Sequence, residues 1–134
     1  MLTEDMKRII REQPLGYVAS VGSDGAPRVS PKATFVVVDD ATIAYGDIRS
    51  PGTNRNLRGD ARVEVNFVDP FVRKGYRFAG TAVVTERGEA GFDAAAPLGA
   101  GIAVTTLYII GLLALYYTTI LRHTTEAKMN AART

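Results

Sequence analysis

Hydrophobic and polar residues alternate through much of the first ninety residues, and this pattern predicts mainly β-strands. In residues 61–69 the apolar side chains stand at every second position, at Val63, Val65 and Phe67. Such alternation is typical of a strand with one buried face. Residues 75–86, with the sequence GYRFAGTAVVTE, alternate in the same way. Both segments are therefore expected to be half-buried strands.

Three further strands are expected earlier in the chain, at residues 16–22, 26–38 and 42–46. Ser, Asp and Gly at residues 23–25 predict a turn between the first two of them. Pro27 and Pro31 cannot donate to a strand ladder, so the first half of the second strand is expected at a sheet edge or at a bulge.

Two short helices complete the pattern. Thr3 can cap a helix running to about Glu12, whose apolar face is formed by Met6, Ile9 and Ile10. Ser50 as a cap, Pro51 at the first helical position and Gly59 as a stop predict a second helix over residues 51–58. Five antiparallel strands, two helices and no βαβ rhythm indicate a β-rich α+β fold, a small barrel.

The C-terminal part differs in character from the rest. Residues 94–121 contain no charged residue, and residues 98–121 are long enough to cross a bilayer as a helix. The alternative is a pair of buried strands, because Val104, Thr105 and Thr106 are β-branched. We expect a domain at residues 1–93 and an apolar, membrane-spanning helix within a tail at residues 94–134.

Composition removes several classes of function. The chain has 134 residues and no cysteine, which excludes disulfides, thiolate nucleophiles and cysteine-ligated metals. The net charge of +2 comes entirely from the tail, where Arg122, Lys128 and Arg133 oppose Glu126. The remainder is neutral, so no nucleic-acid partner is expected. The charged N-terminus is not a secretory signal, and we expect the domain in the cytoplasm.

The segment RSPGTNRNLRG, residues 49–59, is the strongest candidate for a binding site. Arg49 is followed at once by the first turn of the second predicted helix, with Thr53 and Asn54 nearby. A guanidinium, free backbone N–H groups and the positive end of the helix dipole together form an anion site, which predicts a phosphate-bearing ligand. The alternative is an ordinary strand-to-helix connection with a surface arginine.

The ordered segments GYVASVGSDGAPRVSPKATFVV, TIAYGDIRSPGTNRNLRGDARVEVNFVD and RKGYRFAGTAVV resemble the pyridoxamine 5′-phosphate oxidase-like family of FMN-binding split barrels. The resemblance covers about residues 3–93. It implies a split β-barrel of five to six antiparallel strands and a homodimer with FMN in a groove at its interface. Family members follow the last matched strand with a helix and a closing strand. Here, either the tail supplies that closing strand or the barrel keeps an open edge.

The resemblance also implies which residues hold FMN. The ring and ribityl chain are expected along one strand, at Arg28, Val29, Ser30, Pro31 and Lys32. The phosphate end is expected at Tyr45, Gly46, Arg49, Ser50, Thr53 and Asn54. Asn56 is expected to face either the ligand or the helix cap. Lys32 is either a partner of the flavin ring or a solvent-facing strand residue.

The chain offers few groups for catalysis by side chains. His123 is the only histidine, and no spacing of acidic residues suggests an acid/base pair or a metal site. Flavin chemistry needs no such groups, because the cofactor carries the electrons. The resemblance, with which this scarcity agrees, implies an FMN-dependent oxidoreductase acting on a small organic substrate. The alternatives are a non-enzymatic flavin-binding or storage module and a deazaflavin-dependent reductase.

Overall fold

The computed structural model describes residues 1–47, 49–87, 89, 103–108 and 115–118, and the features below are those of these residues. The helices are α1 (Glu4–Glu12) and α2 (Pro51–Gly59). The strands are β1 (Gly16–Val21), β2 (Pro27–Lys32), β3 (Phe35–Val37), β4 (Thr42–Asp47), β5 (Arg62–Asp69), β6 (Lys74–Glu86), β7 (Ala103–Tyr108) and β8 (Leu115–Thr118). The two helices, the turn at residues 23–25 and the other strands expected before residue 87 are confirmed, whereas the single strand expected over residues 26–38 is divided into β2 and β3.

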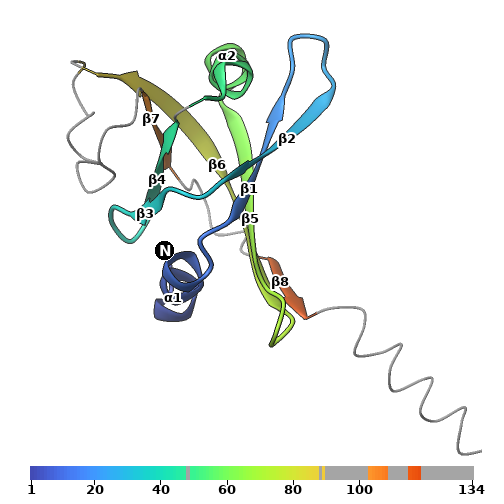
Figure 1. Cartoon of the computed structure of the whole chain (residues 1–134), viewed down its shortest axis with the longest axis vertical. Helices are drawn as coiled ribbons and strands as arrows, with labels where there is room; N and C mark the ends of the chain where they lie inside the picture. Colours follow the sequence, from blue (N-terminus) through green and yellow to red (C-terminus); the bar gives the residue numbers. More distant parts are fainter. Residues whose placement is uncertain (48, 88, 90–102, 109–114, 119–134) are drawn as a thin grey trace, which may run out of the picture.

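The strands form one antiparallel sheet in the order β2-β1-β5-β6-β7-β4-β3, and β8 pairs separately with β6. The two ends of this order, β2 and β3, are halves of a single stretch of chain that bends at Ala33 and Thr34. At the bend, the Thr34 hydroxyl donates to the carbonyl oxygen of Gly46 in β4 at 2.6 Å. Because one half pairs with β1 and the other with β4, this stretch joins the ends of the sheet (Figure 1). The arrangement is consistent with the expected split barrel.

The first half of that stretch lies at the edge of the sheet, as its two prolines predict. Pro27, Arg28, Val29 and Pro31 are all exposed, whereas Lys32 at the end of β2 is buried. Figure 1 shows the β1–β2 hairpin projecting from the barrel beside α2.

The C-terminal segments correct one expectation. β7 pairs with β4 on one side and with β6 on the other, so the tail supplies a strand that closes the barrel. The predicted membrane-spanning helix over residues 98–121 is therefore wrong for residues 103–108 and 115–118, which are strands. β7 pairs the backbone edges of β4 and β6, and its β-branched residue types favour a strand.

Within the described part of the chain, no helix has the length and the apolar character that crossing a bilayer requires. The rest of residues 98–121 lies outside the described residues. The division of the chain at residue 93 stays a prediction.

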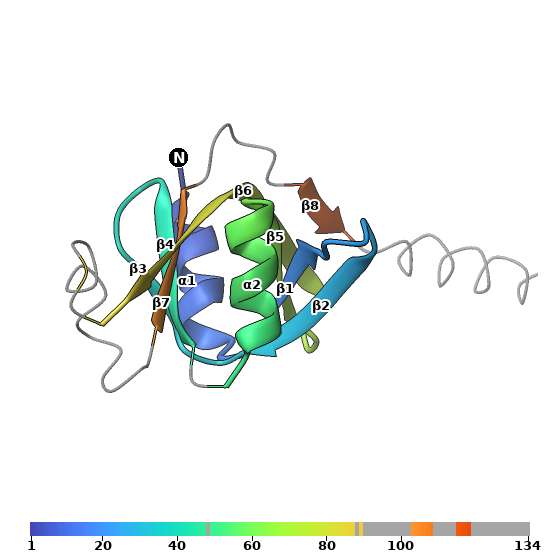
Figure 2. The same cartoon turned by 90° about the horizontal axis from the view of Figure 1, so that it is seen from above.

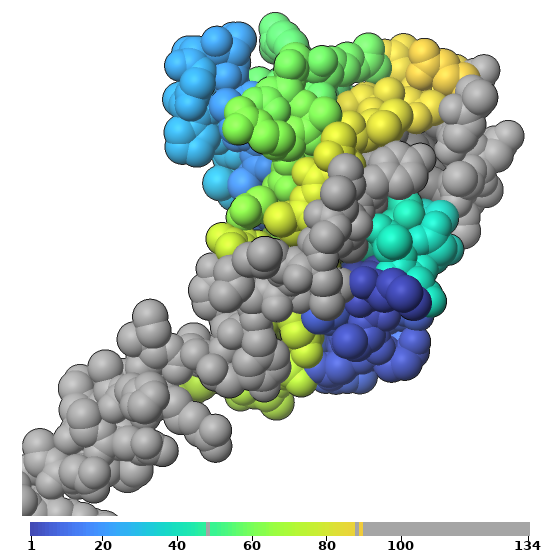
Figure 3. All heavy atoms as spheres, turned by 180° about the vertical axis from the view of Figure 1, so that it is seen from behind, coloured from blue at the N-terminus to red at the C-terminus, as the bar shows by residue number. Residues whose placement is uncertain are grey.

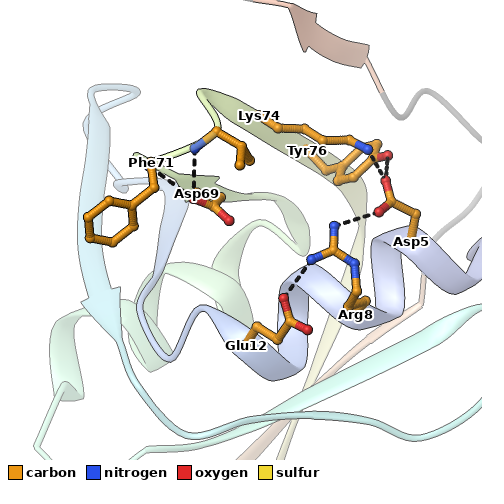
Figure 4. Close-up of polar contacts among 8 residues, drawn as sticks. Asp5, Arg8, Glu12, Asp69, Phe71, Lys74 and Tyr76 are labelled. Carbon is orange, nitrogen blue, oxygen red and sulfur yellow. Dashed lines mark hydrogen bonds and ion pairs between the residues drawn. The ribbon is translucent and has the colours of Figure 1, made fainter.

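α1 closes one end of the barrel, opposite to α2 (Figure 1). Thr3 caps α1, because its hydroxyl oxygen accepts from the backbone N–H of Met6 at 3.3 Å. The predicted apolar face of Met6, Ile9 and Ile10 is buried in the core. On the polar side, the Asp5 carboxylate accepts from the Tyr76 hydroxyl and pairs with the Lys74 ammonium, both from β6 (Figure 4).

An aromatic cluster fills the barrel. The ring of Phe67 lies 4.7 Å from that of Phe35 and 6.0 Å from that of Phe78, both in edge-to-face geometry, and Phe67 is fully buried. Gly16 faces this cluster, where an added Cβ would stand 2.5 Å from Phe35 and 2.7 Å from Phe67. Leu57 of α2 packs onto the same core, so the position of α2 is fixed by the barrel interior.

Candidate cofactor-binding groove

A groove of about 900 Å³ runs between α2 and the β1–β2 hairpin. Figure 2, seen down onto α2, shows the helix lying beside this hairpin, and Figure 3 shows the two next to each other at the molecular surface. The hairpin contributes residues 21–25 and 28–30. The helix contributes Gly52, Thr53, Arg55, Asn56 and Gly59, and Asp60 and Arg62 lie at the far end. Its volume is that of a pocket for a small molecule or cofactor.

The face of α2 that lines the groove carries two glycines, which have no side chains. Gly52, Asn56 and Gly59 lie four and three residues apart, which places them on one side of a helix. A Cβ added at either glycine would meet no heavy atom within 4 Å, so the space beside both is open. Two glycines on the groove side therefore leave room for a ligand against the backbone.

Two backbone N–H groups at the start of α2 have no acceptor within residues 1–47, 49–87, 89, 103–108 and 115–118. Pro51 has no N–H, and the N–H of Asn54 donates to the carbonyl oxygen of Ser50 at 3.2 Å. The N–H groups of Gly52 and Thr53 have no acceptor among the described residues. Both residues line the groove. Such N–H groups, at the positive end of the helix dipole, are donors for an anion.

Ser50 stands at the N-cap position as expected, but its predicted side-chain hydrogen bond to the helix is absent. The Ser50 hydroxyl instead accepts from the Lys32 ammonium. The expectation that Ser50 caps α2 through its side chain is therefore wrong.

Lys32 lies inside the molecule, with 7 % of its surface exposed, so the solvent-facing interpretation is wrong. Its Nζ lies 3.7 Å from Oδ1 of Asp47, which is 3 % exposed, and 5.8 Å from the centre of the Tyr45 ring. Burial lowers the pKa of Lys32, and the charge of Asp47 acts in the opposite direction. Neither carboxylate oxygen of Asp47 has a hydrogen-bond partner among the described residues, so Lys32 is its charge partner there.

The arginines around the groove fall into two groups. Arg28 pairs with Asp24 at 2.8 Å, and Arg62 donates through Nε to Asp60 at 2.9 Å. Arg55 and Arg49 are exposed, and neither has an ion-pair partner among the described residues. Arg55 lines the groove, whereas Arg49 precedes α2. These two guanidinium groups are therefore available to an anionic ligand.

Asn56 and Thr53 connect the groove to the barrel. The side-chain amide of Asn56 donates to the Ser20 hydroxyl of β1 at 3.1 Å, and Thr53 is 8 % exposed. Oδ1 of Asn54 is buried without a hydrogen-bond partner among the described residues. Since these side chains are held by the fold, the polar wall of the groove is largely fixed before a ligand arrives.

Five of the predicted site residues line the groove together: Arg28, Val29, Ser30, Thr53 and Asn56. The others lie around it. Pro31 is exposed on β2, Lys32 is buried, and Tyr45 and Gly46 are buried in β4. Arg49, Ser50 and Asn54 surround the start of α2.

The sequence-based prediction did not include the hairpin turn or the two glycines of α2 among the residues of the binding site. The spacing of Gly52, Asn56 and Gly59 was a signal for a common helix face. Where the hairpin turn lies relative to α2 depends on the barrel and has no local signal. Among the described residues, no three His, Asp or Glu side chains gather into a metal site.

Comparison with known proteins gives the family. The family model for pyridoxamine 5′-phosphate oxidase matches residues 2–106. Among solved structures, HupZ from Group A Streptococcus is 32 % identical, with a TM-score of 0.75, over 86 % of this chain and 94 % of that protein. A putative pyridoxamine 5′-phosphate oxidase from Lactobacillus delbrueckii is 26 % identical, with a TM-score of 0.72, over 81 % and 90 % of the two chains.

An FMN-binding protein from Syntrophomonas wolfei shares the fold, with a TM-score of 0.71 at 11 % identity, over 85 % of this chain and 84 % of that one. No curated protein matches the chain. The family match covers most of the sequence and extends through the first residues of β7. The chain therefore belongs to the pyridoxamine 5′-phosphate oxidase-like family.

Proposed function

We propose that this protein binds FMN in the groove between α2 and the β1–β2 hairpin and acts as an oxidoreductase on a small organic substrate. The observation that carries the proposal is a pair of N–H groups, at Gly52 and Thr53, that have no acceptor in the part of the chain that the structure describes and that line the groove close to Arg49 in the chain. A phosphate monoester satisfies two such donors and a guanidinium at once.

The groove also fits the remainder of such a cofactor. Its volume of about 900 Å³ lies within the range of cofactor sites. Its lining includes the polar side chains Ser30 and Asn56 together with residues of the hairpin turn. FMN supplies hydride and single-electron transfer when bound, so the protein has to bind, orient and shield it. In this proposal Arg49 and the start of α2 hold the phosphate, while β2 lies along the ribityl chain and the ring.

The proposal includes a homodimer. The outer face of the β1–β2 hairpin carries Tyr17 at 44 % exposure and Val29 at 66 %, next to the exposed Pro31. Tyr17 and Pro31 are directly opposite each other in the strand pair, so they share this face. Because prolines remove donors from the β2 edge, a face-to-face contact suits this surface better than a continued sheet. A second copy packed there would cover the apolar face beside the groove.

Two related functions share this scaffold. An F420 reductase has the same fold at 16 % identity and a TM-score of 0.63. HutZ, the heme storage protein from Vibrio cholerae, has it at 17 % identity and a TM-score of 0.60. A deazaflavin cofactor and a storage role are therefore the competing outcomes of the test. A cytoplasmic location, where FMN and nicotinamide cofactors are available, is the expectation that accompanies the proposal.

The test combines binding and turnover. The purified protein is titrated with FMN, the deazaflavin F420 and heme, following FMN and F420 by fluorescence and heme by absorbance. FMN-loaded protein is then mixed with NADH or NADPH without oxygen, and bleaching of the flavin absorbance is recorded. Saturable FMN binding followed by bleaching supports the oxidoreductase. Binding without bleaching by either donor favours storage, and preference for F420 or heme refutes FMN as the cofactor.

A further inference from the structure

We propose that Lys32 is a positioning residue, which keeps the Ser50 hydroxyl from capping α2 and thereby leaves the N–H groups of Gly52 and Thr53 open to an anionic ligand. The proposal rests on the proposed function for the identity of that ligand as a phosphate-bearing cofactor.

The two helices of this chain begin differently, although both have a hydroxyl residue at the N-cap. On α1 the hydroxyl of Thr3 accepts from the N–H of Met6, three residues on. On α2 the equivalent bond would join Ser50 to the N–H of Thr53, and it is not made. A hydroxyl at this position ordinarily accepts from the second or third helical N–H, and this hydrogen bond stabilises the helix. α2 therefore lacks a stabilising contact for which it has the side chain.

The reason lies in a buried pair beneath the helix start. The Lys32 ammonium donates to the Ser50 hydroxyl and so competes with the helix N–H groups for the oxygen that would cap the helix. Lys32 is kept at this place by Asp47, whose carboxylate is 3.7 Å away and has no hydrogen-bond donor among the described residues. A buried carboxylate requires a nearby positive charge. The end of β2 and the end of β4 thus fix the ammonium next to Ser50.

This arrangement determines which backbone N–H groups of the first turn of α2 are available to a ligand. With Pro51 lacking an N–H and Asn54 bonded to the Ser50 carbonyl, the first turn keeps only the N–H groups of Gly52 and Thr53 without acceptors among the described residues. A Ser50 cap would occupy that of Thr53. The Lys32–Asp47 pair also cancels the charge of Asp47, which would otherwise repel an anion at this end of the helix.

The direct test is amide hydrogen exchange measured by NMR on the ligand-free protein. In the wild type, the Thr53 amide should exchange at least about tenfold faster than the Met6 amide, which Thr3 caps. In Lys32→Met/Asp47→Asn, which removes both charges together, the Ser50 hydroxyl becomes available and Thr53 exchange should slow about tenfold. Adding Ser50→Ala should restore fast exchange. The Met6 amide serves as the internal control in every variant.

The functional readout is FMN affinity in the same variants. Lys32→Met/Asp47→Asn should raise the Kd about fivefold, and the added Ser50→Ala should recover most of that loss. A loss without recovery would mean that Lys32 itself contacts the ligand, which overturns the positioning role. Thr53 exchange as slow as that of Met6 in the wild type overturns it too, even if the double variant fails to fold. If the wild type does not bind FMN, the proposed function fails while the exchange data still decide how Lys32 acts on Ser50.

Discussion

Replacing Arg49 with alanine should weaken FMN binding without weakening the fold. Arg49 is exposed and has no hydrogen-bond or ion-pair partner among the described residues, so its removal leaves no described group unpaired. A charge-assisted contact to a phosphate is worth about 1–3 kcal/mol. The exposure of Arg49 places the effect in the lower half of that range, about 1–2 kcal/mol, which corresponds to roughly a 5- to 30-fold rise in Kd.

The assay is a fluorescence titration of FMN into wild type and Arg49→Ala, each at low and high ionic strength. Because the lost contact is an exposed charge pair, the wild-type Kd should rise more steeply with salt than that of the variant. Arg11→Ala is the matched control, since Arg11 is also exposed and without an ion-pair partner among the described residues, and it lies on α1 at the opposite end of the barrel.

The melting temperatures of both variants should stay close to that of the wild type. An unchanged Kd for Arg49→Ala, or an equal loss for Arg11→Ala, would refute the assignment of Arg49 to the phosphate. A lower melting temperature together with a weaker Kd would show that the effect on binding comes through the fold.

Three further predictions concern the frame around the groove. Gly16→Ala should destabilise the protein by roughly 1–3 kcal/mol in urea unfolding, because the new Cβ would stand 2.7 Å from Phe67. Adding Phe67→Leu should recover part of this loss, and a double variant whose loss equals the sum of the two single losses would contradict the contact. Lys32→Met alone should cost roughly 3–5 kcal/mol in the same assay, since it leaves Asp47 as an uncompensated buried charge, and most of the loss should return with Asp47→Asn. Hydrogen bonds from Lys74 and other partners hold the pKa of Asp5 well below its usual range, so its contribution to stability is present above about pH 4 and declines as the pH falls. The melting temperature of Asp5→Asn should therefore fall less between pH 7 and pH 3 than that of the wild type, and parallel declines would count against the Asp5 contacts shown in Figure 4.

Much of the fold could be read from local patterns. The alternation of Val63, Val65 and Phe67 predicted the buried face of β5, and all three side chains lie in the core. Thr3 and the apolar spacing of Met6, Ile9 and Ile10 predicted α1 and its cap. These features depend on backbone periodicity and on neighbours a few residues apart, so the local sequence is sufficient to predict them.

The tail shows where local patterns stop being decisive. A long uncharged run is compatible with a membrane helix or with buried strands, because both remove apolar side chains from water. Residues 103–108 form a strand because β7 pairs with the backbone edges of both β4 and β6. Those edges come from segments far apart in the sequence, so only the assembled barrel reveals the need for a closing strand.

The candidate site divides in the same way. The sequence by itself determined the chemical character of residues 49–59, with an arginine and a helix start suited to an anion. The tertiary structure decided that Lys32 turns inward to Asp47 and Ser50, and that the β1–β2 hairpin forms the opposite wall of the groove. Side-chain type and helix signals are local properties, whereas burial and long-range pairing depend on how β2, β4 and α2 meet in space.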